Sequence, residues 1–92
     1  MRQSVRRYVE RLNTRRFTNN VQRVIYTLLN KGGEWVDTGT FRVNSADSRL
    51  RDLRKNEYGR FNVVCRRQED TTQYRIVVRD LTVAQLREVF PD

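Results

Sequence analysis

The sequence contains no histidine, so it lacks the side chain that most often serves as a general base or a metal ligand near neutral pH. Its single cysteine, Cys65, excludes an internal disulfide and a cluster of thiolate ligands. Neither a phosphate-binding glycine loop nor a nucleophile motif can be recognised. We therefore expect no enzymatic activity, no bound metal and no cofactor, and we look for a binding function.

Long apolar runs are also missing. No stretch approaches the roughly 20 apolar residues that span a membrane. The opening residues, MRQSVRRYVERL, carry charge throughout and lack the apolar centre of a signal peptide. A lone cysteine is typical of a reducing compartment. The sequence predicts a cytoplasmic protein with no membrane association.

Arginine, by contrast, is abundant. The 92 residues include 19 lysines and arginines against 11 aspartates and glutamates, a formal charge of +8, and Lys31 and Lys55 are the only lysines. This balance favours a polyanionic partner, because neutralised phosphates release counterions. The planar guanidinium group also suits bidentate contacts to phosphate and guanine. Ribosomal, membrane-surface and DNA-binding proteins share such a charge, so charge alone does not choose between them.

Apolar spacing predicts two helices in the first third of the chain, which we take to be a single domain over residues 1–92. Residues 1–16 form a basic N-terminal helix, and residues 20–31 form the best core helix. For the second helix we expect a capping box between Asn19 and Gln22. The two apolar stripes consist of Val5, Tyr8, Val9, Leu12, Val21, Val24, Ile25, Leu28 and Leu29.

The segment after the second helix has the weakest pattern. Gly32 and Gly33 supply a left-handed exit from the helix. Trp35 and Val36 are strand-like, and residues 37–40 suit a turn or one loose helical turn. We expect Trp35 to be a core residue that packs near the second helix.

A third helix is predicted over residues 45–56, with a side-chain cap from Asn44 or Ser45. Its buried edge consists of Ala46, Leu50 and Leu53. Two alternating segments follow, and a polar tip over residues 68–72 joins them into an antiparallel hairpin. On this alternation, Cys65 is expected to be a small buried hydrophobe.

The last predicted element is a short C-terminal helix within residues 81–90, opened by a capping box between Thr82 and Gln85. A helix of this length is not stable alone. Its apolar face must therefore pack on its own domain or on a second copy of the chain, which would make a homodimer.

Between the two flanking helices, this order of elements is that of a winged helix-turn-helix domain. The stretch SRLRDLRK, followed by an aromatic residue, an alternating strand, a polar tip and QYRIV, resembles the small helix-turn-helix proteins of bacteriophages and prophages. The resemblance implies an α+β fold with a winged-helix core over residues 19–78, in which three helices precede a β-hairpin wing. Leu50 and Leu53 would anchor the recognition helix. Gly39 lies where the first helix of the pair should be, which predicts a single turn there.

The resemblance and the basic residues together predict a surface for double-stranded DNA. Arginines would contact phosphate or guanine, and the acids of the third helix would orient Arg49 or Arg51 or accept from cytosine. The predicted contacts are Asn44, Ser48, Arg51, Asp52 and Lys55 on the third helix, Arg66, Arg67 and Arg75 on the wing, and Arg6 and Arg7 on the N-terminal helix.

Each group of residues also has a plainer interpretation. The third helix could be an ordinary solvated helix with pairs such as Asp47 with Arg51. The strand arginines could serve only to prevent association between sheets. The N-terminal helix could pack on the domain, contact DNA, form a dimer or lie on a membrane surface.

The predicted function is that of a phage-type or mobile-element-type DNA-binding protein. It would act as a small transcriptional regulator or as an architectural, excisionase-like factor. The alternative is a winged-helix adaptor that binds a host protein and inhibits or redirects it. RNA binding is a third candidate, although most aromatic residues here fall in apolar patterns.

Overall fold

The computed structural model describes residues 1–17, 19–41, 43, 45–55 and 59–90. It confirms an α+β fold. In chain order the described elements are α1 (Gln3–Leu12), α2 (Asn20–Asn30), β1 (Val36–Asp37), the 3-10 turn η1 (Thr38–Phe41), α3 (Ala46–Asp52), β2 (Val63–Gln68), β3 (Thr71–Ile76) and α4 (Val83–Val89). The single turn expected near Gly39 is therefore η1.

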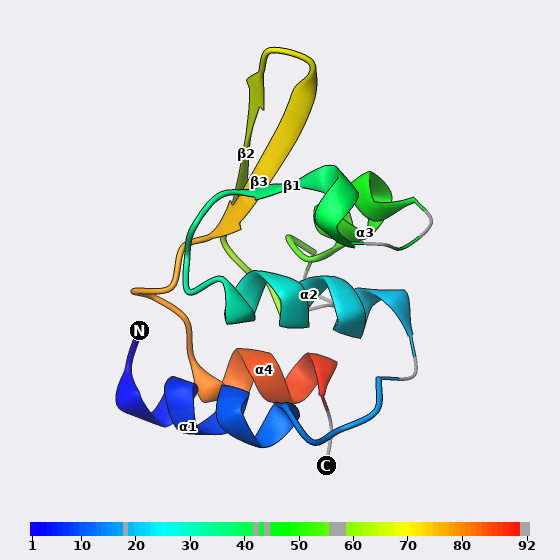
Figure 1. Cartoon of the computed structure of the whole chain (residues 1–92). Coiled ribbons are helices and arrows are strands. Elements are labelled where there is room, and N and C mark those ends of the chain that lie inside the picture. The colour runs from blue at the N-terminus through cyan, green and yellow to red at the C-terminus, as the bar shows by residue number, and fades with distance from the viewer. Residues whose placement is uncertain (18, 42, 44, 56–58, 91–92) are drawn as a thin grey trace.

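The elements form layers around α2. In Figure 1, α1 and α4 lie on one side of α2, and α3 and the sheet lie on the other. The described strands form an antiparallel sheet in the order β1-β3-β2. The β2-β3 hairpin extends beyond the helices, away from α1 and α4 (Figure 1). This layout is compatible with a winged-helix-like arrangement.

The first two helices and the last one form where the apolar spacing predicts them, and α2 and α4 also have side-chain caps. The predicted stripes of α1 and α2 are all buried in one core cluster. Asn19 accepts a hydrogen bond from the backbone N–H of Gln22 at 2.9 Å, which caps α2 and is one half of the expected capping box. Gly32 has the predicted left-handed φ of 63° after α2. The capping box of α4, between Thr82 and Gln85, is complete.

The C-terminal helix packs on its own chain. Leu86 and Phe90 are buried in the same core cluster as α1 and α2. The hydroxyl of Tyr8 donates to the backbone carbonyl of Phe90 at 2.8 Å, and the side chain of Gln22 donates to the carbonyl of Val89 at 2.9 Å. These bonds satisfy carbonyls at the end of α4. The first of the two expected packing modes is thus the one observed.

The third helix is shorter than predicted. It covers Ala46–Asp52 rather than residues 45–56, and Ser45 at its N-cap has a φ of 59° and no side-chain capping bond. The helix ends early because the chain folds back on it. The backbone N–H of Phe61 donates to the carbonyl of Leu53, and the side chain of Arg54 donates to the carbonyl of Val63. The other expected cap, Asn44, lies outside the described residues.

The return of the chain toward β2 requires a glycine. Gly59 has a φ of 88°, and a Cβ built there would lie 2.8 Å from the ring of Phe61 and 3.0 Å from the carbonyl of Gln85. The hairpin tip is also tighter than the predicted residues 68–72, because Gln68 already pairs with Thr71.

Two predicted core residues are not in the core. Cys65 is exposed, and along β2 only Val63 is buried. Trp35 is only half-buried, and it contacts arginines of the sheet. Alternation along a strand gives the face of a residue, but it does not give the point along the strand at which the core ends.

Candidate nucleic-acid interface

The position of α3 is set by its buried edge. Ala46, Leu50 and Leu53 lie in the core at 8 %, 0 % and 0 % exposure, as predicted. Of the residues predicted to face DNA, Arg51 and Lys55 are exposed, and Ser48 and Asp52 are half-buried. Asn44, the remaining one, lies outside the described residues.

Part of the positive charge at α3 is neutralised within the chain. The carboxylate of Asp52 forms ion pairs with Arg49 at 3.3 Å and with Lys55 at 3.1 Å. Asp52 therefore orients Arg49, one of the two roles expected for the acids of this helix. The pair expected between Asp47 and Arg51 takes another form, since Arg51 Nε donates to the backbone carbonyl of Asp47 at 3.4 Å. The guanidinium group of Arg51 remains exposed.

The carboxylate of Asp47 instead joins α3 to the hairpin. It accepts a hydrogen bond of 2.8 Å from the hydroxyl of Tyr74, a buried residue of β3. Burial raises the pKa of Tyr74 to about 12, and the hydrogen bond to Asp47 contributes in the same direction. The nearby positive charge of Arg51 opposes the shift. Arg51 thus lies close to the point where α3 meets the hairpin.

The raised pKa predicts how stability changes in alkali. The folded protein keeps the Tyr74 proton between pH 10 and about 12, where the unfolded chain has lost it. This contribution to the free energy of unfolding is fully present below pH 10 and is lost as the pH rises through about 12. Tyr74→Phe should remove this dependence and should cost about 1 kcal/mol below pH 10 through the lost hydrogen bond. Urea unfolding at pH 9 and pH 11 checks both effects, and an identical alkaline loss in the variant would contradict the assignment.

The register of the hairpin divides the predicted arginines between two faces. Val63, Cys65 and Arg67 alternate with Val64 and Arg66 along β2, and Val63 faces the core. Arg67 therefore lies on the face that looks toward α3. Arg66 and Arg75 lie on the opposite face, because Arg66 pairs with Gln73 and Arg75 pairs with Val64. We call Arg51 and Arg67, on the α3 side, the α3-hairpin surface.

The opposite face carries a cluster that the sequence did not reveal. The guanidinium carbons of Arg66 and Arg75 lie 4.3 Å and 5.4 Å from the centre of the Trp35 ring, as in cation-π contacts. Arg66 Nε also donates to Gln73, whose amide donates to Asp37, both at 2.7 Å. These contacts connect β2, β3 and β1. Both arginines therefore have partners within the sheet.

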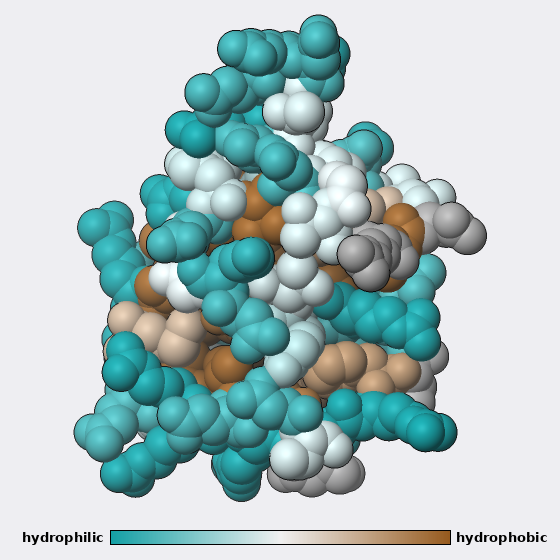
Figure 2. Space-filling view, viewed as in Figure 1, coloured by the Kyte–Doolittle hydropathy of each residue, from teal (hydrophilic) through white to brown (hydrophobic). Residues whose placement is uncertain are grey.

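Acidic residues limit where a polyanion can approach. Asp37, Asp47 and Asp70 line an open groove of about 320 Å³ that also includes Thr38, Gly39, Thr71 and Thr72. Carboxylates in such a groove repel phosphate. Arg51 and Arg67 do not line this groove, although Asp47, which binds Arg51, and Thr72, which pairs with Arg67, do. The hairpin tip above is hydrophilic on the face seen in Figure 2.

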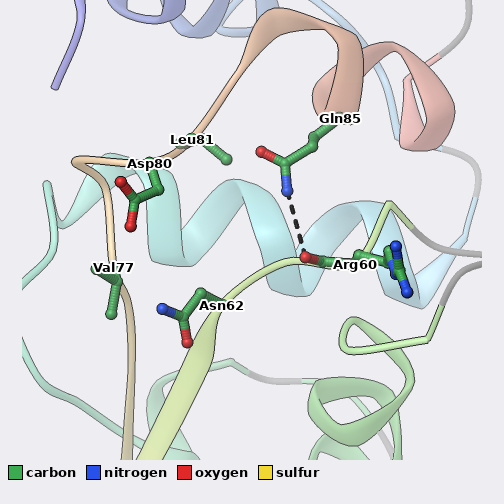
Figure 3. Close-up of a pocket in the computed structure, with 6 residues that line it drawn as sticks. All are labelled: Arg60, Asn62, Val77, Asp80, Leu81 and Gln85. Carbon is green, nitrogen blue, oxygen red and sulfur yellow. Dashed lines mark hydrogen bonds between the residues drawn. The ribbon is translucent and has the colours of Figure 1, made fainter.

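A second hollow lies near the start of α4. It measures about 160 Å³ and is lined by Arg60, Asn62, Val77, Asp80, Leu81 and Gln85. In Figure 3 the amide of Gln85 points to the carbonyl of Arg60, a hydrogen bond of 3.2 Å. The same amide donates to the carbonyl of Gly59 at 3.1 Å. These two bonds hold α4 against the chain that leads into β2, so Gln85 has a structural role here.

The predicted contacts on the N-terminal helix are not brought to the α3-hairpin surface. Arg6 and Arg7 are exposed on α1, which lies on the far side of α2 from α3 (Figure 1).

Comparison with protein-family models, with curated proteins and with solved structures finds no match to this chain. Among the described residues, no helix has both the length and the apolar character needed to cross a membrane.

Proposed function

We propose that this protein binds double-stranded DNA through the α3-hairpin surface, with α3 as the recognition helix and the hairpin as the wing of a winged-helix domain. The observation that carries this proposal is the hydrogen bond between Tyr74 and Asp47. It fixes the hairpin to α3, so that Arg51 and Arg67 lie on the same side of the sheet. A helix beside a projecting hairpin can occupy a major groove while the hairpin contacts the flanking backbone.

The charge of the chain supports the same partner. A formal charge of +8 carried mostly by arginine favours phosphate contacts, and these position a protein without reading sequence. Arg51, on the exposed side of α3, is the residue best placed to reach a base edge. Asp52 forms ion pairs with Lys55 and Arg49, so the charges of these two residues should contribute less to DNA binding than the charge of Arg51. We propose a small phage-type or mobile-element-type regulator or architectural factor as the role of such a protein.

Neighbouring arginines of β2 provide a matched test. Arg67→Gln should weaken binding to a random duplex about fivefold at 150 mM salt and lower the slope of log K against log salt by about one, because one phosphate contact is lost. Arg66→Gln removes the same charge from the face that holds Trp35 and should have a smaller effect. Fluorescence anisotropy across a salt series measures both quantities. Equal losses in the two variants would contradict the assignment of faces.

The competing function is that of an adaptor for a host protein. The acid-lined groove beside α3 favours it, because such a groove suits a basic protein segment better than phosphate. An adaptor without a DNA function should show little affinity for random duplex at physiological salt. The wild-type titration of the same salt series therefore separates the two functions.

A further inference from the structure

The exposed side of α1 is a second basic surface. Arg6, Arg7 and Arg11 of α1 and Arg2 at its N-cap are exposed, and we call these residues the α1 arginine surface. Glu10 is the only acidic residue in this part of the chain. Within the described residues, no carboxylate forms an ion pair with Arg2, Arg6 or Arg7. Their charge is thus available to an external polyanion.

The two basic surfaces face away from each other. α1 packs against α2 and α4, and α3 packs on the other side of α2 (Figure 1). Packed helix axes lie about 8–10 Å apart, so two packing distances separate α1 from α3 before the outward side chains are added. A duplex that lies against α3 and the hairpin therefore cannot also contact the α1 arginine surface while it remains straight.

Bending does not bring one duplex to both surfaces. Contact with both would require a turn of about 180° around a body whose shorter dimensions are 25 and 26 Å. Elastic bending energy grows with the square of the angle, so such a turn costs about four times as much as a 90° bend over the same length. A second duplex segment can reach the α1 arginine surface without this cost.

A lipid surface is a poorer partner for α1. An amphipathic helix binds a membrane by burying its apolar side among the lipids. Here the apolar residues of the helix, Val5, Tyr8, Val9 and Leu12, are all buried in the protein core. The exposed side of α1 therefore presents its arginines, and binding to a phosphate backbone requires no apolar insertion.

We propose that α1 binds the backbone of a second DNA duplex, so that one protein molecule bridges two DNA segments. This inference rests on the proposed function, since the first duplex occupies the α3-hairpin surface. Phosphate contacts carry no sequence information, so the second duplex is bound irrespective of its sequence. The protein would then hold together distant sites of one DNA molecule.

A two-duplex capture assay tests the bridge. A biotinylated 30-base-pair duplex is fixed to beads and loaded with protein, and the retention of a second, fluorescent duplex is measured at 100 mM salt after washing. The wild type should retain the second duplex. Arg6→Gln with Arg7→Gln should lower this retention about tenfold or more, because two phosphate contacts are lost. The matched control, Lys31→Gln with Arg79→Gln, removes two exposed charges elsewhere and should retain it.

The outcomes separate the bridge from the proposed function. If the protein binds the first duplex but retains no second one, the bridge is wrong and the proposed function stands. If the Arg6 and Arg7 variant bridges as well as the wild type, α1 is not the second surface and the inference fails. Binding of α1 to anionic vesicles in preference to a second duplex would also overturn it. If the protein binds no duplex at all, both proposals fail.

Discussion

Replacing Leu50 with alanine should lower the free energy of unfolding by about 2–5 kcal/mol, which is the usual cost of truncating a fully buried leucine. Leu50 is completely buried, and with Ala46 and Leu53 it fixes α3 to the core. Small domains are stable by only about 5–15 kcal/mol, so this loss is a large fraction of the total. Urea unfolding followed by circular dichroism measures it.

Ser48→Ala is the matched control for this experiment. Ser48 lies on the same helix but is only half-buried and outside the core cluster, so its replacement should change the free energy of unfolding by less than about 0.5 kcal/mol. A loss of less than 1 kcal/mol in Leu50→Ala would show that α3 is not held by this side chain. Such a result would remove the support for a fixed recognition helix.

Arg51→Ala should have the largest effect on DNA recognition. Loss of a bidentate contact to a base edge costs about 1–3 kcal/mol of discrimination, or roughly 5–150-fold in relative affinity. The guanidinium group is exposed, and its one described hydrogen bond is to the backbone carbonyl of Asp47. The variant should therefore fold normally while it loses sequence preference.

Selection from a random duplex library provides the measurement. The wild type should enrich a preferred sequence, and Arg51→Ala should bind that sequence and a scrambled duplex with more nearly equal affinity. Arg79→Ala, a change at an exposed arginine in the turn before α4, should leave the preference intact. If Arg51→Ala enriches the same sequence with undiminished preference, α3 does not read bases through this residue.

Adjacent residues of α3 thus have opposite expected phenotypes. Leu50 should affect stability, and Arg51 should affect recognition, because the helical repeat points neighbouring side chains in different directions. The sequence predicts this division correctly for the buried edge, where the spacing of Ala46, Leu50 and Leu53 is a local pattern. It does not predict the length of the helix, because α3 ends where the returning chain bonds to it, Phe61 to Leu53 and Val63 to Arg54.

The candidate site was predictable only in part. The hairpin and its arginines follow from alternation, but their division between two faces depends on the register of β2 with β3. The cluster of Trp35 with Arg66 and Arg75 joins three segments that are distant along the chain. No local pattern identifies such a cluster, and the apolar character of Trp35 by itself predicts a core residue.

The sequence by itself determined the apolar faces of the helices, the caps of α2 and α4, the hairpin and the basic character of the protein, because these depend on residues close together along the chain. Only the tertiary structure decided which arginines share a surface. It put Arg67 on the sheet face that looks toward α3, turned Arg66 and Arg75 toward Trp35, and put Arg6 and Arg7 on the far side of α2. The reason is physical, since the direction of a charged side chain follows from how its element packs, and packing is set by contacts between distant segments.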